Sequence, residues 1–258
     1  MEKSNTQENI IFSVRGLRKT FPGSLEVLSG IDLDIFEREC LVIAGANGSG
    51  KTLLMKILSG LMEATDGEIL FKGNKLSTSI KLLGNSVGLV YQDADSQILG
   101  ETVEEDIRFG PENLKLPLDE IDRRLEENLS ALELTPKRSF SARHLSGGEK
   151  RKLAVAGILA MGCETIIMDE PFANLDWPGV IQVLKIIRDL KKNGKTIVIL
   201  THELEKVLAF ADRLAILAGG KIRDNGEPEA VLDRLEAAWG VRDPRRAYRS
   251  AGECTWLE

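Results

Sequence analysis

The sequence predicts an α/β fold with a mainly parallel β-sheet and a helical segment inserted into it. Short apolar and β-branched runs alternate along the chain with helical stretches, which is typical of parallel strands joined by helical crossovers. Between the strands expected at 87–91 and 165–168, two helical stretches follow one another instead. This change of pattern indicates an inserted helical subdomain over about residues 93–162.

The first elements are expected to be strands. Residues 10–36 carry two β-like runs, IIFSV and IDLDIF, around a turn at residues 22–23. The apolar segment 41–44 is predicted to be a buried strand, and the glycine-rich loop after it leads into a helix over 52–58. Further strands are expected at 67–71 and 87–91.

A helical middle and a second group of strands follow. Residues 119–134 place Ile121, Leu125 and Leu129 on one helical stripe, with charged residues elsewhere, and Pro136 ends the helix. The remaining elements are expected in this order: a helix over 147–161, a strand over 165–168, a helix over 178–192, a strand over 196–200, and a hairpin of 214–217 with 221–224.

Composition narrows the class of protein. Of 258 residues, 43% are hydrophobic, so the chain can bury a sizeable core. Lys and Arg number 34 against 40 Asp and Glu, which gives a net charge of −6. A mildly acidic protein is poorly suited to binding nucleic acid over a broad surface. We therefore expect no nucleic-acid partner, although one loop is enough to bind a nucleotide.

Cysteine usage and hydropathy indicate a protein of the reducing cytosol. Cys40, Cys163 and Cys254 are scattered, odd in number and without metal-ligand spacing, which argues against a disulfide framework. The N-terminus has no pattern of a secretory signal. The longest uncharged apolar stretch, 153–163, is far shorter than the ~20 residues of a membrane-spanning helix. We expect the chain not to cross a membrane, although a partner could hold it against one.

The segment 45–52 fits the pattern GxxxxGK[ST], between an apolar strand and a helix. Its glycines let backbone N–H groups surround phosphate oxygens, and the helix N-terminus adds a partial positive charge. The lysine would reach the β- and γ-phosphates, and the threonine hydroxyl would bind Mg²⁺. An ordinary glycine-rich turn is the alternative, which the strand–loop–helix context disfavours. The predicted phosphate-binding residues are Gly45, Ala46, Asn47, Gly48, Ser49, Gly50, Lys51 and Thr52.

Two acids follow the apolar run at 165–168. Asp169, at the end of a buried strand beside a phosphate loop, suits a Mg²⁺ ligand. Its neighbour Glu170 points elsewhere and is placed to polarise an attacking water. A pair of solvated acids at the surface is the alternative. The phosphate loop favours the metal and base roles.

The sequence Leu-Ser-Gly-Gly-Glu at 145–149 indicates a second phosphate-binding surface. Two glycines are poor helix formers, yet a long helix follows them directly. Exposed N–H groups at a helix start, together with the Ser146 hydroxyl, can bind phosphate. One nucleotide does not need two such surfaces from one chain, so we expect two chains to pair head to tail. A Ser-Gly-Gly loop used only as an N-cap is the alternative.

With these motifs in this order, the chain resembles the ATP-binding cassette family over about residues 10–228. The resemblance implies a P-loop NTPase (RecA-like) core, an N-terminal antiparallel β subdomain and the inserted helical subdomain that carries the family signature. Residues 229–258 are left as a C-terminal extension of unknown role. Its arginines at 242, 245, 246 and 249 could touch lipid or a partner, but a solvated tail is favoured.

The resemblance also implies roles for individual residues. Phe21 lies where the family places an aromatic that stacks on adenine. Gln92 matches the glutamine that links the γ-phosphate and Mg²⁺ to the membrane partner, and His202 matches the histidine that contacts the γ-phosphate. The nucleotide-contacting part of the signature is Ser146, Gly147 and Gly148, and Asp176 closes the loop that crosses the dimer interface. The implied catalytic residues are Lys51, Gln92, Glu170 and His202. Lys150, Arg151 and Lys152 are instead interpreted as a solvated helix face.

A narrower resemblance covers the segments 91–97 and 102–113. They look like the ATPase subunits of energy-coupling-factor importers, which include cobalt, nickel and vitamin importers. Gln97 is the second glutamine of that group, whereas Ala94 replaces its common proline and Glu149 replaces the usual signature glutamine.

Acids near the start of the second of these segments are expected to matter for assembly. Glu104 and Glu105 are predicted to meet basic residues of a membrane component. The alternative is an ordinary acidic helix start.

We expect an ATPase subunit, working with ATP and Mg²⁺, that energises a membrane importer for a metal ion or vitamin. It would pair with a second ATPase subunit and lie at the cytoplasmic face of the membrane, bound to integral membrane components. A soluble ATPase of the same family acting on DNA or ribosomes is the main alternative. Only 52 residues separate Gln92 from Leu145, too few for a long coiled coil, and the chain has one phosphate loop. A module that binds nucleotide without turnover is disfavoured because all four expected residues are present, Lys51, Asp169, Glu170 and His202.

Overall fold

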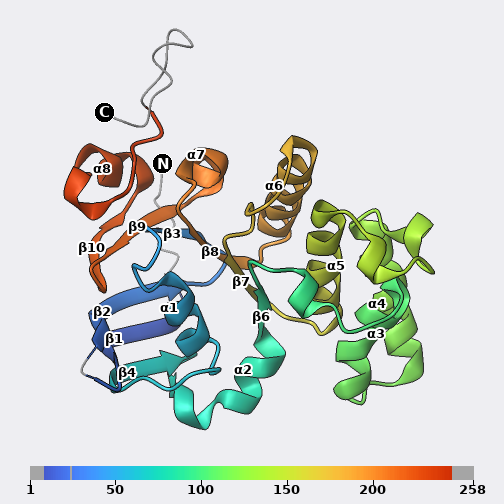
Figure 1. Ribbon diagram of the computed structural model, residues 1–258. Helices are drawn as coiled ribbons and strands as arrows, with labels where there is room; N and C mark the ends of the chain where they lie inside the picture. The colour runs from blue at the N-terminus through green and yellow to red at the C-terminus, as the bar shows by residue number, and fades with distance from the viewer. Residues whose placement is uncertain (1–8, 24, 246–258) are drawn as a thin grey trace, which may run out of the picture.

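Two β-sheets and a group of helices make up the structure, a computed structural model that describes residues 9–23 and 25–245 (Figure 1). The larger sheet has the strand order β10-β9-β3-β8-β7-β6. Its strands from β9 to β6 run parallel, and β10 pairs antiparallel with β9. They are β3 (Cys40–Ala44), β6 (Val87–Val90), β7 (Thr165–Asp169), β8 (Thr196–Thr201), β9 (Arg213–Ala218) and β10 (Lys221–Gly226).

The smaller sheet is antiparallel and has the order β2-β1-β4-β5. Its first two strands pair antiparallel along their length, from Phe21 opposite Leu25 to Ile10 opposite Phe36. Together the two sheets confirm the predicted fold, a mainly parallel core with an N-terminal antiparallel subdomain. The strands are β1 (Ile10–Phe21), β2 (Leu25–Phe36), β4 (Asp66–Phe71) and β5 (Asn74–Lys75).

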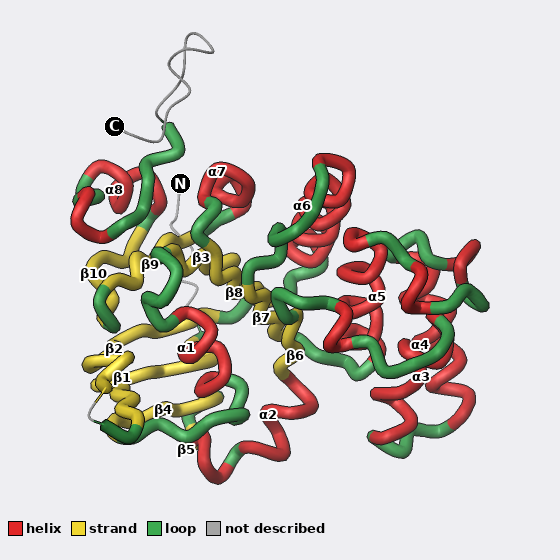
Figure 2. The backbone as a smooth tube through the Cα atoms, viewed as in Figure 1, coloured by secondary structure: helices red, strands yellow, loops and turns green. Residues whose placement is uncertain are grey.

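Helices connect the strands and form the inserted group (Figure 2). Three of them, α2, α7 and α8, lie where the sequence pattern predicts none, and α3 lies where a helix start was only the alternative. The helices are α1 (Lys51–Leu58), α2 (Ile80–Ser86), α3 (Val103–Asn113), α4 (Leu118–Ala131), α5 (Gly147–Ala160), α6 (Trp177–Lys192), α7 (Leu204–Val207) and α8 (Pro228–Asp233).

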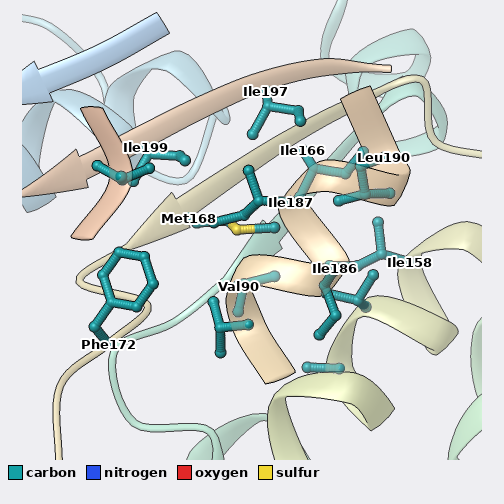
Figure 3. Close-up of a cluster of buried hydrophobic side chains, with 14 of the residues drawn as sticks. Val90, Ile158, Ile166, Met168, Phe172, Ile186, Ile187, Leu190, Ile197 and Ile199 are labelled. Carbon is teal, nitrogen blue, oxygen red and sulfur yellow. The ribbon is translucent and has the colours of Figure 1, made fainter. Parts of the chain in front are cut away.

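Alternation along each central strand divides the core into two layers. In β3, Leu41 and Ile43 face α1 and the antiparallel sheet, whereas Val42 faces the side covered by α5 and α6. Figure 3 shows this second layer, where Ile166 of β7 lies among side chains of α6 such as Ile187. Because both faces are covered, the central strands β7 and β8 are apolar between their polar end residues, as is typical of parallel sheets.

The inserted helices α3, α4 and α5 lie together at one side of the sheet, between β6 and β7 in the chain (Figure 1). The predicted stripe of Ile121, Leu125 and Leu129 is buried against its neighbours. Helix α5 also packs on β6 and α6, so the inserted group shares one hydrophobic layer with the sheet. Movement of α5 therefore cannot be independent of the sheet edge.

Packed structure continues beyond the predicted boundary at residue 228. Val231 and Leu232 of α8 are buried in the layer next to β9 and β10. Arg245 pairs with Glu229 and Asp233 of that region, at 2.9 and 2.8 Å. The arginines at 246 and 249 lie outside the described residues.

The two described cysteines are free and buried. Burial raises the pKa of Cys40 to about 12 and that of Cys163 to about 11. Because the thiolate is the reactive form, both thiols are inert at neutral pH. Cys254 lies outside the described residues.

Candidate active site

The glycine-rich loop 45–50 connects the buried strand β3 to the start of α1. Gly50 has φ +105°, and a Cβ there would lie 2.7 Å from Cδ2 of Leu28. Only glycine fits this sharp entry into a helix below the β1–β2 hairpin. The loop borders a pocket of about 250 Å³. Its lining residues are Val27, Asn47, Gly48, Gly50, Lys51, Thr52, Leu53, Gln92 and Glu170.

Lys51 is 6% exposed and is held inside its own loop. Its Nζ donates to the carbonyl oxygens of Gly45 and Ala46 at 2.7 and 3.2 Å. It also lies 3.2 Å from Oε1 of Glu170, an ion-pair contact without hydrogen-bond alignment. A buried ammonium needs such partners. Phosphate oxygens in the pocket could replace them.

Asp169 ends β7 beside the first turn of α1. Thr52 Oγ1 donates to its Oδ2 at 2.7 Å. Its Oδ1 is buried and has no partner within the described part of the chain. Burial raises the pKa of Asp169, opposed by the Thr52 hydrogen bond. An unpaired carboxylate oxygen next to a hydroxyl is a donor set that a hard divalent cation prefers.

Glu170 has a left-handed backbone, with φ +45°, and is 6% exposed. Its Oε2 accepts from Thr201 Oγ1 at 3.1 Å and from the His202 backbone N–H at 3.3 Å. The same oxygen lies 2.9 Å from His202 Nδ1. Residues in such a backbone conformation are costly and persist where their surroundings hold them. The structure thus brings together Lys51, Glu170 and His202, which the sequence predicts as catalytic.

Gln92 lines the same pocket, at the start of a loop that a second glutamine closes. Gln97 Nε2 donates to the Leu89 carbonyl at 2.6 Å, and its Oε1 accepts from the Tyr91 backbone N–H at 3.1 Å. These two bonds pin the loop 91–97 to the end of β6. The sequence singled out Gln97 only by resemblance; this contact gives it a physical role.

The signature sequence 145–149 leads into α5, and its side chains bind the backbone N–H groups at the start of that helix. Ser146 is the N-cap, and the Glu149 carboxylate accepts from the Ser146 backbone N–H at 2.9 Å, forming a capping box. Glu149 also pairs with Lys137 at 2.6 Å. A Cβ on Gly148 would lie 2.5 Å from Oε1 of Gln182 on α6. Ser146 therefore does cap α5, and Gly148 lets the helix approach α6 closely, since a Cβ there would also lie 3.1 Å from the Gly179 Cα.

The loop after β7 leads to a second pocket beside the signature. Asp176 caps α6 by accepting from the Gly179 backbone N–H at 3.0 Å, and Trp177 next to it is 76% exposed. The pocket, about 450 Å³, shares no lining residue with the phosphate-loop pocket. Its lining residues are Ser146, Gly147, Gly148, Asn174, Leu175, Asp176, Pro178, Gly179 and Gln182. One chain therefore presents two separate surfaces that could hold phosphate.

Phe21 is less closely associated with the site than the other predicted residues. It ends β1 opposite Leu25, outside the set that lines the phosphate-loop pocket. Lys19 Nζ lies 5.4 Å from its ring centroid. Val27, further along the hairpin, lines the pocket instead.

The predicted solvated face at 150–152 is wrong. Arg151 and Lys152 are buried, because α5 is covered by its neighbours around most of its circumference. Lys150 pairs with Asp95, and Lys152 pairs with Glu133 at 2.9 Å.

The acids expected to dock a membrane component have partners inside the chain. Glu104 pairs with Arg138 at 2.6 Å, and Glu105 forms a capping box with Thr102. Asp106 accepts from the Leu99 and Gly100 backbone N–H groups at 2.7 and 2.9 Å. These contacts correspond to the alternative, an acidic helix start.

Comparison with other proteins agrees with this arrangement. A family model described as ABC transporter matches residues 28–173. The chain is 39% identical to the energy-coupling factor transporter ATP-binding protein EcfA of Methanocaldococcus jannaschii, over 92% of this chain and 87% of the relative. It is 40% identical to the cobalt import ATP-binding protein CbiO of Rhodobacter capsulatus, over 91% and 85%.

A solved structure is also similar. It is cbiO1 from Clostridium perfringens, described as part of the ABC transporter complex cbiONQ. The TM-score is 0.81 at 32% identity, and the match covers 90% of this chain and 93% of that one. Within the described residues, no helix has both the length and the apolar character needed to span a bilayer.

Proposed function

Because the chain belongs to the ABC transporter family, whose ATP-binding subunits hydrolyse ATP to power transport, we propose that it energises an energy-coupling-factor importer for a metal ion or a vitamin. The observation that carries the proposal is the match to EcfA and CbiO proteins over about nine-tenths of the chain. The alternative, a soluble ATPase acting on DNA or ribosomes, has no such support.

ATP binding follows from the phosphate-loop pocket. The first residues of α1 line the pocket, and the N–H groups and dipole of a helix start favour anions. Arriving phosphates would draw the Lys51 ammonium away from the carbonyls of Gly45 and Ala46. This exchange would also separate Lys51 from Glu170 and leave that carboxylate free to act on water.

Mg²⁺ fits the residues beside this pocket. Thr52 and the unpaired oxygen of Asp169 would hold it, with Gln92 at the pocket edge. The ion would neutralise charge on the β- and γ-phosphates. Glu170 would accept the proton of the attacking water, and His202, bonded to Glu170, would hold the γ-phosphate.

A second ATPase subunit completes each site in this proposal. Phosphate-loop and signature pockets are separate in one chain, so each nucleotide would lie between the loop of one subunit and Ser146 of the other. Phe21, at the hairpin tip, would stack on adenine. The assembly would lie on the cytoplasmic face of the membrane, bound to integral membrane components.

Removal of the phosphate-loop cation tests nucleotide binding. Lys51→Ala should lose most MgATP affinity and nearly all turnover, measured by isothermal titration and phosphate release. Lys192→Ala, which removes a surface lysine at the end of α6, should leave both unchanged. Unaltered affinity and turnover in Lys51→Ala would contradict the site.

Uptake tests the importer assignment. Cells that express the chain with its membrane components should take up a cobalt, nickel or vitamin substrate, and Lys51→Ala should abolish that uptake. An ATPase that copurifies with ribosomes or DNA and supports no uptake would favour the alternative.

A further inference from the structure

Arg151 connects two functional loops to the signature helix through backbone carbonyls. It lies in α5, five residues after the signature serine, and is 4% exposed. Both ends of its guanidinium are used. The bonds are Nε to the Pro171 carbonyl at 3.1 Å, Nη1 to Tyr91 at 2.9 Å, and Nη2 to Gln92 at 2.5 Å and Ala173 at 3.5 Å.

Burial of the Arg151 guanidinium costs free energy that packing alone would not justify. Within the described residues, no carboxylate forms an ion pair with it; Asp93 and Asp95 act only at longer range. Burial lowers the pKa of Arg151 accordingly. An apolar side chain of similar volume generally serves a core at least as well as a buried charge. The guanidinium therefore contributes geometry, because its planar fork fixes the directions of several bonds at once.

The bonded carbonyls belong to segments with different tasks. Gln92 begins the loop at the phosphate-loop pocket, whereas Pro171 directly follows Glu170 and leads toward the second pocket. Helix α5 itself presents Ser146. The same side chain thus links Gln92, which lines the first pocket, to the helix whose N-cap, Ser146, lines the second.

Contacts next to Arg151 involve the same loop and the same segment after β7. Neighbouring Lys150 pairs with Asp95 and so ties α5 to the same loop. A pocket of about 280 Å³ lies where the loop, the start of α5 and the segment 173–175 meet, and Arg151 lines it. This open space gives the segments room to shift while the arginine keeps them together.

We propose that Arg151 is a positioning residue. It couples Gln92, which lies at the nucleotide bound by its own phosphate loop, to Ser146, which the same chain presents to the other nucleotide of the pair. The inference rests on the proposed function, because it needs two nucleotides shared between two chains. When the γ-phosphate draws Gln92 inward, the guanidinium carries α5, and with it Ser146, in the same movement. Without Arg151, ATP still binds, but the signature no longer follows.

The test replaces the Arg151 guanidinium in the full chain. It measures hydrolysis, ATP binding and subunit pairing separately. Arg151→Met should lower kcat about 10–100-fold, the loss expected for hydrogen bonds to a charged group, with the KM for ATP within about 2-fold. Arg151→Lys keeps the charge and loses the fork, and should recover only part of kcat. Lys152→Met, which removes a buried neighbouring cation paired with Glu133 and contacting neither loop, should change kcat by less than about 2-fold.

A double-mutant cycle separates coupling from general damage. If Arg151 acts through Gln92, adding Arg151→Met to Gln92→Ala should slow hydrolysis little further. In the Glu170→Gln background, Arg151→Met should bind ATP normally and form less of the ATP-dependent dimer. Melting curves identify misfolding, in which case Arg151→Lys supplies the same comparisons.

Two outcomes would overturn the coupling role. One is unchanged kcat in both Arg151 variants; the other is a double variant whose loss equals the product of the single losses. Failure of the Glu170→Gln chain itself to form an ATP-dependent dimer would contradict the proposed pairing instead.

Discussion

Glu170 makes four contacts from a backbone conformation that only a few per cent of non-glycine residues adopt. Thr201 and His202 hold one carboxylate oxygen, and Lys51 lies against the other. In this arrangement the carboxylate proposed as the base lies against the cation that ATP would recruit. Under the proposed function, nucleotide binding would therefore also free the base.

Glu170→Gln separates these roles. The amide keeps the shape and the bonds from Thr201 and the backbone but cannot accept the water's proton. Hydrolysis should slow by about 10²–10⁴-fold, the usual contribution of a general base, while ATP stays bound. Single-turnover kinetics with labelled ATP would measure both. Glu164→Gln, an exposed acid just before β7, should behave as wild type; normal hydrolysis in Glu170→Gln would assign the base elsewhere.

At the scale of elements, α5 depends on its first turn. Two glycines weaken that turn, and the reciprocal bonds of Ser146 and Glu149 offset the loss. Glutamic acid in place of the usual signature glutamine keeps the box, since either side chain can reach back to the N-cap. The substitution is thus structurally conservative, and the acid gains Lys137 as a partner.

Glu149→Ala should lower the free energy of unfolding by about 1 kcal/mol, the usual value of a helix cap. Glu149→Gln should lose less, about 0–1 kcal/mol, because only the exposed ion pair disappears. Urea unfolding followed by circular dichroism measures the difference. Equal losses in both variants would show that the ion pair, not the box, stabilises the helix start.

At the scale of the whole molecule, the two pockets are separate, and under the proposed pairing they would divide one reaction between two chains. The signature face is formed by α5, α6 and the loop between β7 and α6, whereas the phosphate loop lies at the junction of the two sheets. Each chain would give one half-site and receive another.

Ser146→Arg should therefore leave ATP binding intact and prevent pairing. In the Glu170→Gln background, the ATP-dependent dimer should disappear from a sizing column. Mixed with a Lys51→Ala chain, the variant should restore at most one composite site. Ser130→Arg, the same change on the exposed end of α4, is the control and should still dimerise. Persistence of the dimer in Ser146→Arg would argue against head-to-tail pairing.

Local patterns predicted residues that the structure brings together around the phosphate loop. Lys51, Asp169 and Glu170 sit in short motifs where residue type and neighbouring strand carry the information. Arg151 escaped prediction because three successive basic residues resemble a solvent-facing turn, and burial there comes from elements distant in sequence. Helix α3 was expected only as an alternative, because Gly110 and Pro111 lie in it, although Thr102 and Glu105 already formed a capping signal.

The exposed position of Trp177 has a consequence for the fluorescence of the protein. Its indole stands in water beside Asp176, at the rim of the signature pocket. Burial of an indole shifts its emission to shorter wavelength, so pairing through this face would be visible without any dye. With Trp239 and Trp256 replaced by phenylalanine, the remaining fluorophore would report each closing and reopening cycle in a stopped-flow instrument, in real time.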